Sequence, residues 1–220
     1  HFYIYVIMYF GAILYLSAST VITAREFQNR SRLLIYPLIL FVMAETIIQV
    51  ALPELHVTWL CVTLLSVLYF IYCSEMWNQL DALTGLLNQN SYLKQTGGVR
   101  YKGGVLVVFD VDDFKQINDR YGHIQGDLCL AGIAECIKKS YANFGYCYRI
   151  GGDEFCVLLK NGGNEGRCKQ EFFAETARKN EGRLHFLPTV SYGSAPFSGE
   201  DIVKVKDRAD QDMYQYKKRT

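Results

Sequence analysis

The chain has 220 residues with 23 basic and 22 acidic side chains, so its net charge is only +1, which gives no support for a nucleic-acid partner. The seven cysteines contain no Cys-x-x-Cys pair. Their spacing therefore fits neither a disulfide scaffold nor a zinc site, and it indicates a reducing compartment.

The first 77 residues are much less polar than the rest and hold only seven of the charged side chains. Three apolar runs follow one another there, over about 2–22, 33–52 and 57–77. Each is long enough to cross a bilayer as a helix, so the runs predict three transmembrane α-helices. The alternative is a buried helical bundle in a soluble protein. Because His1 already lies within an apolar run, we expect the N-terminus of the whole protein to lie further upstream.

The charges in the loops predict an orientation. The loop over 23–32 carries three arginines, whereas the loop over 53–56 carries no Lys or Arg. By the positive-inside rule the first loop is cytoplasmic, and the third helix then delivers residues 79–220 to the cytoplasm. The prediction is a multi-pass protein of the lipid bilayer, with a membrane region over 1–78.

An ionisable residue, Glu45, lies within the second apolar run, and Gln49 follows one turn later. A charge at that depth is costly, so the side chain should face another helix or a cavity. It makes an interhelical hydrogen bond or belongs to a ligand or proton site, and both interpretations stay open.

The joint between the membrane region and the soluble part, residues 74–100, contains no Gly or Pro over 75–80, which indicates that the third helix continues inward. Gly85 then breaks the helix, and Asn88 can cap a new helix over 89–95. We expect a short, helical link that passes movements of the membrane helices to the soluble part.

The soluble part begins with a continuous β-branched and apolar run over 104–111, typical of a buried central strand. Further elements are predicted in chain order: a helix over 127–139, hairpin strands over 146–150 and 155–159, a helix over 171–179, a strand over 188–195 and a helix over 198–217. This order predicts an α+β fold, a ferredoxin-like α/β sandwich with added elements.

The hairpin turn reads Gly151-Gly152-Asp153-Glu154. It is a simple glycine turn, or a site where two carboxylates hold a hard cation and a phosphate approaches the backbone. In the predicted sheet, Asp110 at the end of the first strand lies beside this turn. Three carboxylates there would repel one another unless a cation neutralises them, and Mg²⁺ suits oxygen ligands. The arrangement indicates metal-assisted phosphoryl transfer.

Two further pairs of residues are candidates for binding a nucleotide. Lys204 and Arg208 are spaced i,i+4 and can meet a polyphosphate, with a solvated basic helix face as the alternative. Asn118 and Asp127 can read guanine through an amide and a carboxylate. The alternative for this second pair is capping of a turn and a helix.

Together these residues resemble the GGDEF family of diguanylate cyclases over about 80–218. The motifs that carry the resemblance lie at 81–86, 109–119, 121–127, 149–155, 190–193 and 208–214. The resemblance implies that residues 79–220 form a GGDEF domain that condenses two GTP to cyclic di-GMP and releases two pyrophosphates. Because each active site holds one GTP, it also implies a homodimer through this domain. Cyclic di-GMP receptors would act downstream, and the membrane would be the bacterial cytoplasmic membrane.

Position by position, the resemblance implies a role for each matching residue. Asp110, Asp153 and the backbone carbonyl of Val111 bind Mg²⁺ or Mn²⁺, two ions per active site, and Glu154 assists the metal site or activates the 3′-hydroxyl. Asp153 and Glu154 are thus the expected catalytic residues. The expected substrate contacts are Lys115, Lys204 and Arg208 at phosphates, Gly151 and Gly152 near the α-phosphate, and Asn118 and Asp127 at guanine. Because some relatives that make mixed cyclic dinucleotides carry a small polar residue in its place, Asp127 favours two guanines.

The chain departs from the family at two places. Ala142 and Gly145 stand where many members have the Arg and Asp of an inhibitory product site, so no such site is expected. The family's common Asn-Arg-Arg is Asn88-Gln89-Asn90 here. The alternative to a membrane-regulated cyclase is a catalytically silent GTP-binding or dimerisation module. Degenerate relatives usually lose signature acids, so the acids retained here favour catalysis.

Overall fold

The computed structural model describes residues 58–97, 103–181 and 187–218, and the single positions 11, 40, 44, 47, 48 and 51. The chain divides into two compact units, His1–Asn78 and Gln79–Thr220. The first two apolar runs, 2–22 and 33–52, lie outside the described residues except at those single positions. The loop charges and Glu45, on which the predicted orientation and intramembrane site depend, lie outside them as well.

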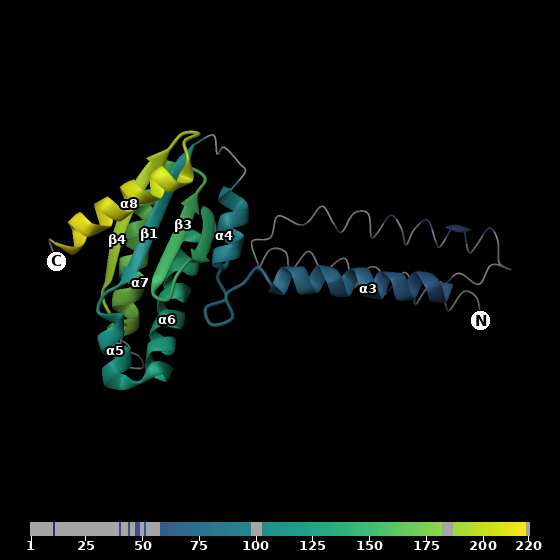
Figure 1. The fold of residues 1–220 in the computed structure, drawn as a ribbon, viewed down its shortest axis with the longest axis horizontal. Coiled ribbons are helices and arrows are strands. Elements are labelled where there is room, and N and C mark those ends of the chain that lie inside the picture. Colours follow the sequence, from purple (N-terminus) through teal and green to yellow (C-terminus); the bar gives the residue numbers. More distant parts are fainter. Residues whose placement is uncertain are drawn as a thin grey trace. The chain divides into compact units, whose positions relative to one another are not determined.

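The first unit contains α3 (Thr58–Trp77), drawn as a ribbon in Figure 1. Its bounds confirm that the third apolar run is helical. Large apolar side chains along it, including Phe70 and Ile71, are exposed. Among the residues that the structure describes, no helix combines the length and the apolar character needed to cross a membrane.

The second unit is built on a four-stranded sheet in the order β2-β3-β1-β4 (Figure 1). The strands are β1 (Gly104–Val111), β2 (Gly145–Arg149), β3 (Glu154–Leu159) and β4 (Val190–Phe197). All three strand pairs are antiparallel, with β1 between β3 and β4. This strand order confirms the predicted ferredoxin-like arrangement, in which the first and last strands pair although the β2–β3 hairpin and three α-helices separate them in the chain.

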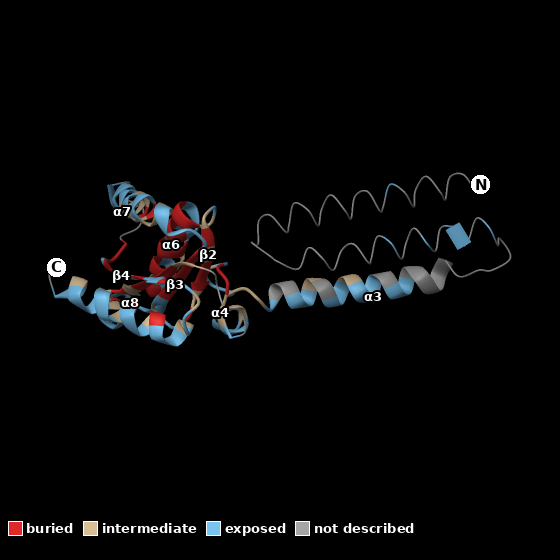
Figure 2. Ribbon diagram, turned by 90° about the horizontal axis from the view of Figure 1, so that it is seen from above, coloured by how far each residue is buried: buried red, intermediate tan, exposed pale blue. Residues whose placement is uncertain are grey.

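Helices cover both faces of this sheet, as Figure 2 shows for α6 and α7 on one side and α8 on the other. The helices are α4 (Gln89–Thr96), α5 (Phe114–Tyr121), α6 (His123–Tyr141), α7 (Glu165–Glu181) and α8 (Ile202–Lys217), with a 3-10 turn, η2 (Gly162–Asn164), before α7. The result is a sheet enclosed between two helical layers.

The alternation of side chains along β1 divides the core between these layers. Phe109 packs towards α6 and α7, with its ring 5.6 Å from that of Tyr141 and 5.0 Å from that of Phe172. Leu106 and Val108 belong to a second cluster of buried side chains on the opposite face of the sheet, to which α8 also contributes. Because Asp110 is two residues beyond Val108, the same alternation puts it on the face that α8 covers.

The structure differs from the sequence analysis in three places. The expected helical link is not formed, because α3 ends at Trp77 and residues 78–88 contain only turns, a bend and isolated bridges. Residues 114–121, which have no predicted helix, form α5, and α6 begins at His123 rather than Asp127. Gly122 joins the two helices with φ +83°, a conformation that favours glycine, so the turn is a single residue. Gly126 lies buried inside α6.

The joint closes onto the outer edge of β2. The amide of Leu87 donates to the carbonyl of Cys147 at 3.0 Å, and the amide of Arg149 donates to the carbonyl of Leu87 at 2.8 Å. The Asn88 side chain accepts from the amide of Ser91 and caps α4, as predicted. Within the second unit, the segment just after Asn78 is therefore fixed beside the strand that leads into the Gly151-Gly152 turn.

Candidate active site

The register of the sheet brings the three signature acids, Asp110, Asp153 and Glu154, to one edge of the sheet, where β1 ends and β3 begins. Asp110 on β1 pairs with Glu154 on β3 and with Ser191 on β4. The amide of Val111 donates to the carbonyl of Asp153 at 3.3 Å. The end of the first strand therefore lies beside the turn, as the sequence predicts.

The turn itself closes on Glu154. The amides of Ile150 and Gly151 both donate to its carbonyl, at 3.0 and 3.3 Å. A Cβ at Gly151 would lie 3.2 Å from the Cβ of Glu154, whereas a Cβ at Gly152 would meet nothing within 4 Å. Gly152 therefore presents open backbone, which suits the approach of a phosphate.

Arg149 holds this turn to the joint. Its guanidinium donates to the Gly152 carbonyl at 2.7 and 3.2 Å, and to the two carboxylate oxygens of Asp81 at 3.1 and 3.3 Å. Asp81 also accepts from the amide of Thr84 at 2.9 Å and from its hydroxyl at 2.6 Å. Partial burial acts to raise the pKa of Asp81, but these hydrogen bonds and the Arg149 charge outweigh it and lower the pKa.

Replacing Asp81 by Asn is expected to cost about 1–2 kcal/mol in the free energy of unfolding at pH 7. Because the folded-state pKa of Asp81 is lowered, its contribution is present at neutral pH and is lost as the pH falls through that pKa, below about pH 4. Urea unfolding from pH 3 to pH 7 should therefore show a wild-type advantage that shrinks towards pH 3. The matched control is Asp119→Asn on the exposed face of α5. An Asp81→Asn deficit that does not vary with pH would contradict this interpretation.

A basic side chain from α8 reaches the strand-end acids. The ammonium of Lys217 lies 2.9 Å from Oδ1 of Asp110 and 3.4 Å from Oδ1 of Asp112. The hydroxyl of Ser191 donates to the same oxygen of Asp112 at 2.6 Å. The hydrogen bond to Asp110 is the main cause that raises the pKa of Lys217. One positive charge therefore bridges two carboxylates at the end of β1.

The carboxylate oxygens at this edge suit a metal ion that binds together with the phosphates of a nucleotide. Within the described ranges, no three Asp, Glu, His or Cys side chains gather as a ready-made metal site. Asp110 and Asp112 nevertheless converge on one positive group. Mg²⁺ is commonly held by one or two protein carboxylates while phosphate and water fill its remaining positions.

Asn118 and Asp127 come from neighbouring helices. A Cβ at Gly126, the residue before Asp127, would lie only 2.0 Å from Oδ1 of Asn118, so the amide packs directly on α6. That oxygen is buried and has no hydrogen-bond partner among the described residues. Asp127 itself is exposed. The contact with Gly126 therefore brings Asn118 close to the residue that precedes Asp127.

Lys204 and Arg208 lie in the first two turns of α8. The guanidinium of Arg208 donates to the carbonyl of Pro196 at 2.8 Å and pairs with Glu200 at 2.8 Å. Pro196 lies opposite Val105, which is about 17 Å along β1 from the strand-end acids. Lys204, in the first turn of α8, is exposed. Because α8 runs back along β4, its last turn brings Lys217 to Asp110.

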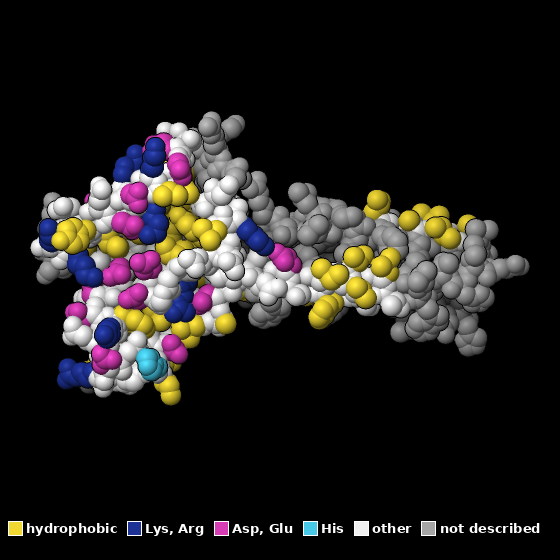
Figure 3. Space-filling model, viewed as in Figure 1, with side chains coloured by type: hydrophobic (Ala, Val, Ile, Leu, Met, Phe, Trp, Pro, Cys, Tyr) yellow, Lys and Arg dark blue, Asp and Glu magenta, His cyan; other side chains and the backbone are white. Residues whose placement is uncertain are grey.

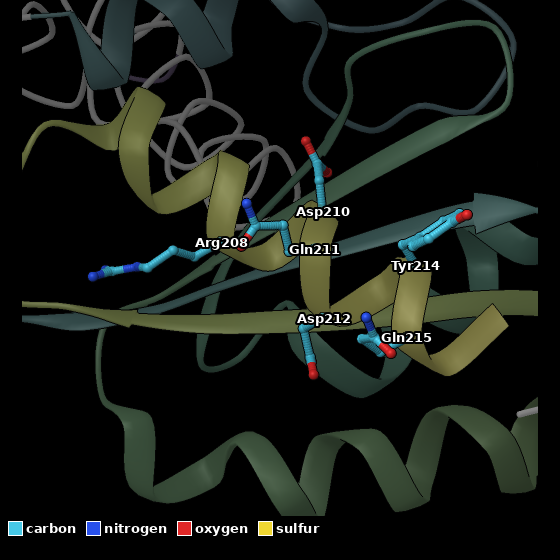
Figure 4. A pocket seen from close by; sticks show the side chains of 6 residues that line it. All are labelled: Arg208, Asp210, Gln211, Asp212, Tyr214 and Gln215. Atoms are coloured by element: carbon cyan, nitrogen blue, oxygen red, sulfur yellow. The ribbon is translucent and has the colours of Figure 1, made fainter. Parts of the chain in front are cut away.

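Arg208 also lines an open depression on α8, shown in Figure 4. The other lining residues are Asp210, Gln211, Asp212, Tyr214 and Gln215. Asp110 and the residues of the Gly151–Glu154 turn do not line it. On the face seen in Figure 3, acidic and basic side chains are interspersed over the second unit rather than gathered by sign. The site is therefore identified from the strand register. Neither this depression nor a cluster of basic side chains on that face identifies it.

The remaining predicted positions are placed as follows. Lys115 is exposed in the first turn of α5, three residues beyond Asp112. Ala142 follows the last residue of α6, and Gly145 begins β2. A Cβ at Gly145 would lie 2.4 Å from the carbonyl oxygen of Leu158, so an acidic side chain could not stand there without a shift of the backbone.

Comparison with known proteins agrees with these observations. Residues 78–220 match the family described as diguanylate cyclase, GGDEF domain. Diguanylate cyclase DgcS of Shewanella oneidensis is 32% identical over 144 residues, which cover 62% of this chain and 49% of the relative. Diguanylate cyclase DgcZ of Escherichia coli K12 is 30% identical over 159 residues, covering 68% of this chain and 53% of the relative.

The fold of the second unit also matches solved structures. The GGDEF domain of DgcB from Caulobacter crescentus, in complex with c-di-GMP, matches with a TM-score of 0.55 and 27% sequence identity. That match covers 64% of this chain and 90% of the other. The chain spans about half the length of the two curated relatives named above.

Proposed function

Because the chain belongs to the GGDEF-domain family, we propose that it is a diguanylate cyclase that condenses two GTP to cyclic di-GMP and two pyrophosphates. The observation that carries this proposal is the strand register, which places Asp110 opposite Glu154 and beside Asp153. Oxygen ligands and open glycine backbone meet there, as phosphoryl transfer requires.

In this proposal the residues of the edge act by positioning and by charge. Asp110, Asp153 and the Val111 carbonyl would hold Mg²⁺ or Mn²⁺, two per site, and the bound ions would supply neutralisation of phosphate charge. The backbone at Gly151 and Gly152 would accommodate the α-phosphate, with Lys115 close to the same strand end. Glu154, exposed at the start of β3, would assist the metal site or accept the 3′-hydroxyl proton.

In this proposal, Asn118 and Asp127 recognise guanine. What supports this role is the packing of the Asn118 amide against Gly126, the residue before Asp127. An adenine edge presents a different pattern of donors and would leave one of these acceptors unpaired, which is costly. The site is therefore proposed to select GTP over ATP.

The reaction needs a second copy of the chain. One edge, with one pair of guanine-reading residues, holds one GTP, so two such edges must face each other as a homodimer. Cyclic di-GMP receptors would then act on the product. With Ala142 and Gly145 in place of a charged pair, we propose no product inhibition through that position.

The membrane region is proposed as the regulatory part. The apolar runs 2–22, 33–52 and 57–77 would anchor residues 1–78 in the bacterial cytoplasmic membrane and leave residues 79–220 in the cytoplasm. What supports regulation through the joint is its attachment to the signature turn: Asp81 binds Arg149, and Arg149 binds the carbonyl of Gly152. A shift of the joint would therefore displace the turn.

The purified protein, incubated with GTP and Mg²⁺, is expected to form cyclic di-GMP, identified by mass spectrometry. A fused parallel coiled coil would enforce the dimer, and ATP in place of GTP would give no cyclic product. Asp153→Asn is the matched inactive control. If the enforced dimer binds GTP but forms no cyclic di-GMP, the cyclase proposal is wrong and the chain is a silent nucleotide-binding module.

A further inference from the structure

The ammonium of Lys217 occupies the position that a cation would approach at the strand end. It contacts Oδ1 of Asp110 at 2.9 Å, and Oδ1 of Asp112 lies within 3.4 Å. We propose that Lys217 is a built-in counter-ion that competes with divalent metal for Asp110 in the nucleotide-free protein. The inference deepens the proposed function, since it concerns the same site.

Packing of the last turn of α8 directs Lys217 to the acids. The ring of Tyr216 stacks on that of Phe173 from α7, with centroids 6.5 Å apart and an interplanar angle of 20°. One turn earlier, α8 lies so close to β4 that a Cβ at Gly193 would be 2.5 Å from the amide nitrogen of Met213. The backbone that carries Lys217 is therefore held on both sides.

The competition follows from charge. A divalent ion bound directly to Asp110 would lie about 4–5 Å from an ammonium that holds the same carboxylate, and two positive groups at that separation repel each other. A bound metal ion must then either displace Lys217 from Asp110 or bind more weakly because of this repulsion. A nucleotide brings negative charge that offsets the added positive charge, so the penalty is greatest for the metal alone. Metal would accordingly enter the site with the nucleotide rather than before it.

The test measures Mn²⁺ binding without nucleotide, from the loss of the free-ion electron paramagnetic resonance signal. Lys217→Met is expected to bind Mn²⁺ about 10-fold more tightly than the wild type. Lys217→Arg retains the charge and should restore weak binding. The matched control is Lys218→Met, because Lys218 instead lies over the ring of Tyr214 at 4.3 Å.

Two results would overturn the inference. One is a Lys217→Met protein that is folded by circular dichroism yet binds Mn²⁺ no more tightly than the wild type. The other is tightening that persists in the Asp110→Asn, Lys217→Met double variant, since the added affinity would then come from elsewhere. The measurement does not use turnover, so failure of the proposed cyclase activity would show separately.

Discussion

Asp110→Asn is expected to lower the rate of cyclic di-GMP formation by about 10³-fold while leaving the unfolding transition near its wild-type position. The change keeps the size of the side chain but removes the charge that faces Lys217 and, in the proposed reaction, the metal. Only charge and coordination are lost, because Asn can still occupy the same space at the end of β1.

The measurement is the initial rate of product formation at saturating GTP and Mg²⁺, with urea unfolding recorded for the same preparations. Asp119→Asn is the matched control, since Asp119 is exposed on α5 and has no proposed role. Turnover of Asp110→Asn within a few-fold of the wild type would remove Asp110 from the active site. A rate loss accompanied by an equal loss in Asp119→Asn would point to a general charge effect.

Gly193→Ala is expected to destabilise the second unit by ~2 kcal/mol and to lower turnover as well. A Cβ at Gly193 would lie 2.2 Å from the carbonyl oxygen of Ala209 and 2.5 Å from the amide nitrogen of Met213. Both contacts are with helix backbone, which cannot rotate away as a side chain can. The methyl group therefore forces α8 away from β4, and Lys217 moves with it.

The control for this change is Gly166→Ala, because a Cβ there would meet nothing within 4 Å on α7. Alanine in a helix is favoured over glycine by about 0.5–1 kcal/mol, so this variant should be neutral or slightly more stable. Thermal unfolding of the two variants gives the comparison. Equal stability of Gly193→Ala and the wild type would show that α8 does not require this close approach.

The sheet could be predicted from sequence because its strands carry strong local signals. The apolar run over 104–111 has the bounds of β1, and the pair of runs on either side of Gly151-Gly152 has the register of a hairpin. Local signals failed where a glycine serves packing rather than a turn. Gly126 lies inside α6 because Asn118 packs against it, and that contact cannot be read from the residues around it.

The acids of the site were also predictable from local signals, because Asp110 lies near the end of a strand and Asp153 lies in a hairpin turn. Lys217 was not, because its contact with Asp110 joins residues 107 positions apart. The i,i+4 spacing of Lys204 and Arg208 gives a basic helix face but not the direction in which the helix crosses the sheet. That direction depends on the packing of Gly193 against Ala209 and Met213.

The most direct measurement is the position of Mn²⁺ and a non-reactive GTP analogue in a crystal of the protein, located by the anomalous signal of the metal. We predict Mn²⁺ bound to the carboxylate of Asp110 and the carbonyl of Val111, with phosphates beside Gly151 and Gly152 and the base between Asn118 and Asp127. Nucleotide seated in the depression around Arg208 and Tyr214, with no metal at Asp110, would contradict the proposed active site.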